Sequence, residues 1–84
     1  MTRPAEKPCK RCGAPILWVH RHGQAPFPVD ARPSPTGRHE LYVDDDDRLR
    51  SRFLTKSRAR DLIARAGSVH NHHRLTCNPN RRLP

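Results

Sequence analysis

This 84-residue chain is expected to be organised around Cys9-Lys10-Arg11-Cys12-Gly13, near its amino end. Two cysteines separated by two residues can place both thiolates on one metal ion, and the following Gly can turn the backbone beneath them. The third cysteine, Cys77, lies near the other end, and His73 stands four residues before it. The pattern C-x2-C, 60 residues, H-x3-C therefore predicts a Cys3His site for one structural Zn2+ ion that joins the two ends of the chain.

The fourth ligand is the open part of this pattern, because His70, His72 and His73 all lie close to Cys77. His73 is preferred, since three intervening residues allow a compact loop, and His72 is the next alternative. The competing interpretation is that the three cysteines are free, buried or reactive. A filled Cys3His sphere has no open position for water, so the pattern favours a structural metal over a catalytic one.

The composition indicates one small domain that needs a staple. Only 33% of the residues are hydrophobic, and a chain of this length is marginal on core burial alone. Three cysteines do not form a complete disulfide framework. The amino end lacks the apolar segment of a signal peptide, and no run approaches the ~20 apolar residues of a membrane span. We therefore expect a cytoplasmic protein, in a compartment where cysteine binds metal rather than forming disulfides.

Strand formers and turn residues alternate after the cysteine pair, which predicts two β-hairpins. The prolines of the second strand cannot donate to a ladder, so this strand is expected at an edge or with breaks. The expected elements are strands over 16–21 and 25–30 around a turn at 22–24, a Pro/Ser/Gly loop over 31–38, and strands over 39–43 and 48–54 around a turn at 44–47.

A short helix is expected over 57–66, with Thr55 or Ser57 as its cap and Gly67 just after its end. One stripe of this helix is apolar and consists of Ala59, Leu62, Ile63 and Ala66. Residues 68–77 would return to the metal as a short strand or an extended turn. The predicted fold class is thus a small β-rich (α+β) zinc-ribbon-like domain, with two β-hairpins and one short C-terminal helix stapled by one zinc. Its expected parts are a flexible N-terminal arm over 1–8, the domain over 9–77 and a basic tail over 78–84.

The charge balance favours an acidic partner. The net charge is +9, and 14 of the 17 basic residues are Arg, which suits phosphate recognition. Alternation in the fourth strand would place three arginines on one solvent face, about 6.8 Å apart per step. We therefore expect noncatalytic binding of DNA or RNA, and no small-molecule substrate. The alternative is a solvated face partly neutralised by the acidic turn 44–47. The predicted contact residues are Arg48, Arg50, Arg52, Arg58 and Arg65.

Three other features carry weaker signals. Trp18 on a strand indicates core or a lid over the metal site more than a platform for stacking bases. The run 44–47 lacks the Gly and the distal Glu of a calcium loop. The tripeptide His70-Asn71-His72 spells HNH, but HNH nucleases spread these residues over a hairpin and a helix. With no other catalytic set in view, the chain is expected not to be an enzyme.

The motifs together resemble small zinc-ribbon proteins of actinobacteria and their phages. The resemblance covers both ends and the first hairpin, is weaker in the middle, and departs where Asn78 stands in place of the family's usual Pro. It implies Cys9, Cys12, His73 and Cys77 as ligands, a phage or mobile-element origin, and the cytoplasm of a bacterial host, and it assigns no activity. The rival to nucleic-acid binding is a small phage factor that binds and modulates a host protein. The matching residues are Cys9, Cys12-Gly13-Ala14-Pro15-Ile16, Trp18, Pro28-Val29-Asp30, His73 and Thr76-Cys77.

Overall fold

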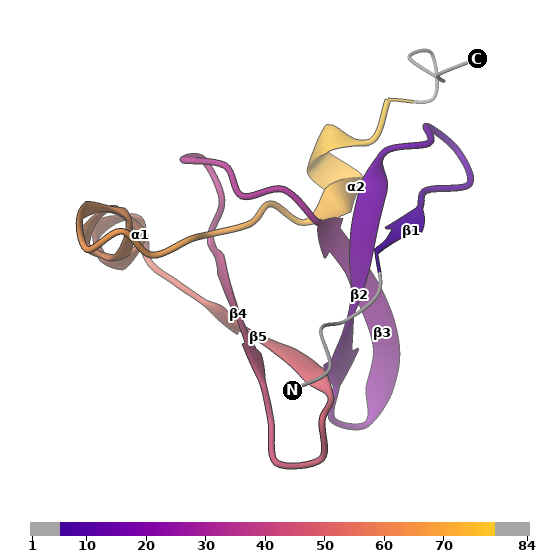
Figure 1. Ribbon diagram of the computed structural model, residues 1–84, viewed down its shortest axis with the longest axis horizontal. Helices are drawn as coiled ribbons and strands as arrows, with labels where there is room; N and C mark the ends of the chain where they lie inside the picture. The colour runs from indigo at the N-terminus through magenta and orange to yellow at the C-terminus, as the bar shows by residue number, and fades with distance from the viewer. Residues whose placement is uncertain (1–5, 79–84) are drawn as a thin grey trace.

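The computed structural model describes residues 6–78, which form two antiparallel sheets and two helices (Figure 1). Strands β1, β2 and β3 make the first sheet in that order, and β4 and β5 make the second. This confirms the predicted α+β fold with two hairpins and a short helix. Among these residues, no helix is both long and apolar enough to cross a membrane. The elements are β1 (Lys7–Pro8), β2 (Pro15–Arg21), β3 (Gln24–Asp30), β4 (His39–Val43), β5 (Leu49–Phe53), α1 (Lys56–Ala64) and α2 (His73–Thr76).

The first hairpin buries one face of its alternating sequence. Val19 of β2 lies opposite Phe27 of β3, and both are buried together with Val29. Leu49 of β5 completes this first hydrophobic cluster. Because neighbouring side chains of a strand point to opposite faces, the other face of β2, which carries Trp18, is turned away from this cluster.

Strand β1 changes the expected boundary of the domain. Lys7 pairs with Ile16 and Pro8 pairs with Pro15, so the last two residues of the predicted arm 1–8 belong to the first sheet. Residues 1–5 of that arm lie outside the described part of the chain, as does the predicted basic tail 78–84 apart from Asn78.

The second hairpin departs from the predicted two-faced strand. Arg50 was expected in solvent, but it is 8% exposed, and its Nε donates to Asp44 Oδ2 at 2.7 Å. The same alternation places Leu49 and Phe53 on the face opposite the arginines, where burial would be expected, yet 68% of Phe53 is exposed. Two-stranded ribbons twist strongly, so a face that is covered at one end need not be covered at the other. The prediction of a continuous, solvent-exposed arginine row is therefore wrong at Arg50.

Helix α1 begins where the sequence indicates. The Thr55 side chain caps it by accepting a hydrogen bond from the Arg58 backbone N–H at 3.3 Å. Ala59 faces inward and packs with Leu54 and Val69 in a second hydrophobic cluster. This cluster holds α1 to the end of β5 and to the segment that follows the helix.

The end of α1 comes two residues earlier than predicted, and its cap is shifted by one. Ala66, not Gly67, takes the left-handed conformation after the helix, with φ of 64°. The backbone N–H of Gly67 donates to the Leu62 carbonyl at 2.9 Å, and that of Ala66 donates to the Ile63 carbonyl at 3.0 Å, which is a Schellman arrangement. Gly67 is needed for close packing instead, since a Cβ there would lie 2.4 Å from Leu62 Cδ1.

The segment 68–77 joins the two sheets before it reaches the metal-binding residues. His70 pairs with His39 of the second sheet, and His72 pairs with Val29 of the first. The sequence predicted a short strand or extended turn here, and the structure adds the one-turn helix α2, which was not predicted. Figure 1 shows α2 beside the first sheet, with α1 on the far side of the second hairpin.

Candidate metal centre

The first half of the centre is the turn between β1 and β2. Gly13 has φ of 78°, which suits Gly, and its N–H donates to the Cys9 carbonyl at 2.8 Å. The Cys9 N–H donates to the Ala14 carbonyl at 2.8 Å. The N–H of Arg11 points at Cys9 Sγ, 3.4 Å away. These backbone bonds set the positions of Cys9 and Cys12 within the turn.

Helix α2 supplies the second half, from the opposite end of the chain. His73 Nε2 lies 3.4 Å from Cys12 Sγ, and Cys77 Sγ lies 3.9 Å from Cys9 Sγ. The four ligand atoms are all within 4.8 Å of one another, and Cys12 and His73 are buried. The S–S separation is about twice a disulfide bond length, and all three cysteines are free. The structure thus brings together the four predicted ligands, Cys9, Cys12, His73 and Cys77, as a candidate metal site.

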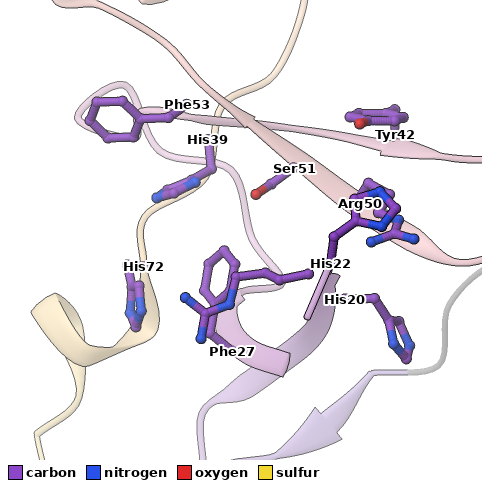
Figure 2. A pocket seen from close by; sticks show the side chains of 10 residues that line it. His20, His22, Phe27, His39, Tyr42, Arg50, Ser51, Phe53 and His72 are labelled. Atoms are coloured by element: carbon purple, nitrogen blue, oxygen red, sulfur yellow. The ribbon is translucent and has the colours of Figure 1, made fainter. Parts of the chain in front are cut away.

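The other two histidines near Cys77 have different roles. The His72 ring stacks on Phe27, with centroids 5.0 Å apart, and its Nδ1 accepts the Arg74 backbone N–H at 3.1 Å. His70 Nδ1 donates to the Asp30 carbonyl at 2.8 Å. Figure 2 shows His72 facing a separate pocket that also holds Phe27 and His39. The geometry therefore selects His73 among the three alternatives.

Asp30, at the end of β3, orients the histidine ligand. Its Oδ1 lies 2.7 Å from His73 Nδ1, and the Thr76 hydroxyl lies 2.8 Å and 2.7 Å from the two carboxylate oxygens. A carboxylate at Nδ1 keeps the proton there and leaves Nε2 free to bind metal. From the sequence, Asp30 is expected only at the end of a strand, with no role in the site. The sequence signal that could have indicated this role is that Asp30 belongs to Pro28-Val29-Asp30, one of the motifs on which the resemblance to small zinc-ribbon proteins rests.

The electrostatics of the cluster fit a cation. The backbone N–H groups of Cys12 and Arg11 lower the pKa of Cys9 to about 6. Burial, followed by the neighbouring thiols, raises the pKa of Cys77 to about 11. Burial acts to lower the pKa of His73, but its hydrogen bonds with the Asp30 carboxylate and with the thiols outweigh burial and raise the pKa above its usual value. The thiols resist ionising together because their charges repel, and a divalent cation among them would remove that repulsion.

Three of the five arginines predicted to contact nucleic acid meet at one place. Arg52 of β5 and Arg58 and Arg65 of the α1 region line a hollow of about 300 Å³. Two acidic residues, Glu40 and Asp61, share it. Arg52 Nη1 lies 3.4 Å from Glu40 Oε1, and the Arg52 side chain is 64% exposed.

The other two predicted arginines lie apart from this hollow. Arg48 is exposed at the end of the turn of the second hairpin, where its N–H donates to Asp44 Oδ1 at 3.0 Å. Arg50 is buried against the same Asp44. The pKa of Asp44 is lowered to about 2, first by its hydrogen bond with Arg50 and then by the Arg48 N–H. Arg50 therefore serves the hairpin rather than an open surface.

No family model, curated protein or solved structure matches this chain. The resemblance to small zinc-ribbon proteins of actinobacteria and phages therefore rests on the quoted sequence motifs and stays a prediction. What the chain does has to be argued from its own residues.

Proposed function

We propose that this protein is a noncatalytic domain that is stabilised by zinc and binds nucleic acid. Tetrahedral zinc with its usual bond lengths separates two sulfurs by about 3.8 Å and a sulfur from a nitrogen by about 3.6 Å. The corresponding distances here are 3.9 Å and 3.4 Å, which supports zinc as the metal. Four protein ligands leave no open position on the ion, so its role is to hold the fold.

The observation that carries nucleic-acid binding is the convergence of Arg52, Arg58 and Arg65 on one hollow. Planar guanidinium groups bind phosphate in a bidentate manner, and a chain with a net charge of +9 attracts a polyanion. The Glu40–Arg52 pair is 3.4 Å long and its arginine side chain is 64% exposed, so a phosphate can displace Glu40 at little expense. Arg48 adds an exposed positive charge on the same hairpin.

Fluorescence anisotropy of a labelled oligonucleotide at several salt concentrations tests this proposal. Each phosphate contact adds about 0.7 to 0.9 to the slope of log affinity against log salt. The triple variant Arg52→Gln, Arg58→Gln, Arg65→Gln should lower both the affinity and the slope, by about two to three in the slope. The matched control is Arg60→Gln, an exposed arginine of α1 that does not line the hollow. Absence of binding to DNA and RNA at low salt would refute nucleic-acid binding, and a triple variant that binds like wild type would refute this surface.

A second candidate function is docking on another protein, and the apolar surface of the second hairpin favours it. Phe53 is 68% exposed and Tyr42 is 43% exposed. Both line the pocket of about 420 Å³ in Figure 2, whose floor includes Phe27 and His72. Exposed aromatic residues beside a pocket are typical of protein interfaces. A pull-down from nuclease-treated bacterial lysate should recover a specific protein that is lost with Phe53→Ser, and recovery unaffected by this substitution would contradict docking here.

A further inference from the structure

We propose that a basic pocket beside the metal centre binds single-stranded nucleic acid by stacking one unpaired base on Trp18. This inference rests on the proposed nucleic-acid function and assigns the place where a base is held. The pocket measures about 660 Å³, which is far larger than a metal ion needs. It is bordered by Cys9, Cys77 and His73, and it opens beyond them toward the outer face of β2.

The sheet register sets an apolar wall on this face. Trp18 lies directly opposite Pro28, and Ile16 lies two residues before Trp18 on the same face of β2. Pro8 of β1 adjoins them in the pocket. Trp18 is 44% exposed, in contrast to the buried Val19 on the opposite face. The sequence favoured core or a lid over the metal for this indole; its exposure rules out core, and it lines the pocket beside Cys9, His73 and Cys77.

The rim of the pocket is strongly basic. Four cationic side chains line it, and all four belong to exposed residues. Among the residues that the structure describes, no Asp or Glu lines it. A zinc ion with three thiolates and one neutral histidine has a net charge of −1, which four cations outweigh. These basic side chains would contact the phosphates on either side of a base stacked on Trp18. The four residues are Lys7, Lys10, Arg11 and Arg74.

The other hollows are less suited to holding a stacked base, although the arginine hollow can still contact phosphates. The arginine hollow includes Glu40 and Asp61. In the pocket of Figure 2, Arg50 is already paired with Asp44, and Arg21 donates to the Ala25 carbonyl at 2.8 Å. The Trp18 pocket combines an open aromatic ring with a rim that, within residues 6–78, carries no carboxylate. An unpaired base can stack on this ring, whereas a duplex keeps its bases stacked on one another.

Trp18 is the one tryptophan in the chain, so intrinsic fluorescence reports on this pocket directly. The zinc-loaded full chain is titrated with dT12, with U12 and with a 12-base-pair duplex, while anisotropy of a labelled strand measures binding independently. We expect the single strands to quench Trp18 with the same midpoint as the anisotropy change. Trp18→Ala should lower the affinity about 5- to 100-fold, and Trp18→Phe should retain most of it. The dT12 and U12 arms distinguish DNA from RNA.

Charge reversal provides the second measurement and its control. Lys7→Glu with Arg74→Glu should weaken binding and abolish quenching, whereas Lys56→Glu with Arg60→Glu on α1 should preserve the quenching. Zinc content and circular dichroism identify any variant that fails to fold. The quenching of Trp18 in the wild-type protein tests the proposal even if a variant fails to fold.

The possible outcomes distinguish failure of the Trp18 pocket from failure of the proposed nucleic-acid binding as a whole. If the oligonucleotide binds by anisotropy while Trp18 fluorescence and the Trp18→Ala affinity stay unchanged, this inference is wrong and the proposed function stands. If no oligonucleotide binds, both are wrong. If an acidic peptide such as oligo-Glu quenches Trp18 and the single strands do not, the pocket is a protein-binding site and the inference is overturned.

Discussion

Replacement of Asp30 is the most direct test of the metal centre that the structure offers. Asp30→Ala removes the carboxylate that holds His73 Nδ1 at 2.7 Å and receives the Thr76 hydroxyl. It leaves all four ligands in place. Asp30→Asn is the graded companion, because its amide oxygen can still accept the Nδ1 proton while the negative charge is lost.

The expected magnitude follows from what the carboxylate does. Loss of a hydrogen-bonded group behind a metal ligand lowers metal affinity about 10- to 100-fold, or about 1.4 to 2.8 kcal/mol. This range agrees with the value of about 1.5 to 3 kcal/mol for a hydrogen bond to a charged group. We expect Asp30→Ala at the upper end and Asp30→Asn near tenfold. Since metal binding and folding are linked, the zinc-loaded protein should lose a similar free energy of unfolding.

Competition for zinc against a chromophoric chelator at pH 7 measures the affinity. Thr76→Val, which removes one donor to Asp30, should give a smaller loss than Asp30→Ala. The matched control is Asp61→Ala, an exposed aspartate on α1 that makes no contact with the centre. Wild-type zinc affinity in a correctly folded Asp30→Ala would refute the role of Asp30 in orienting His73.

Four further predictions concern the fold. Arg50→Ala should lower Tm by at least about 5 °C, because a buried ion pair is broken, whereas Arg52→Ala should change stability by less than about 0.5 kcal/mol; equal shifts in thermal melts would contradict this. Ala66→Gly should raise the free energy of unfolding by about 1 kcal/mol in urea titrations, since it removes a left-handed Ala, and a loss would contradict it. Gly37→Ala should lower it by about 1 to 3 kcal/mol, because a Cβ would lie 2.6 Å from the His70 backbone. EDTA should abolish the tertiary structure seen by near-ultraviolet circular dichroism, and an unchanged spectrum after complete zinc removal would contradict a structural role.

Local signals in the sequence were enough to predict the first half of the metal centre and the hairpins. The spacing of Cys9 and Cys12 and the Gly that follows them define a turn without reference to the rest of the chain. Spacing favoured His73, because three intervening residues allow a compact loop, but the final choice among His70, His72 and His73 could not be made from spacing alone. It depends on the two sheet bridges, which engage His70 and His72 and direct the chain so that α2 presents His73 to the cysteines.

The prediction of a continuous, solvent-exposed row of arginines was wrong for a different physical reason. Alternation predicts which residues share a face, but it does not show which neighbour covers that face. Arg50 shares a face with Arg52, yet Asp44 at the hairpin turn reaches Arg50 and shields it. The alternative interpretation, in which the acidic turn neutralises nearby arginines, applies to Arg50. Asp44 of this turn pairs with Arg50. Which arginine it reaches depends on the three-dimensional shape of the hairpin, which alternation in the sequence does not show.

The need for a metal follows from where the hydrophobic residues lie. Val19 and Leu49 belong to one cluster and Leu54 and Val69 to another, and each cluster is small. The segment 70–72 pairs with both sheets just before His73, so fixing His73 and Cys77 against the cysteine pair also fixes the position of this segment between the hairpins. Structural zinc binds zinc-finger peptides with an apparent free energy of about 10 to 16 kcal/mol, comparable to the stability of about 5 to 15 kcal/mol of a typical domain. Zinc at this position would therefore reinforce the small cluster of Val19 and Leu49 in holding the two hairpins together.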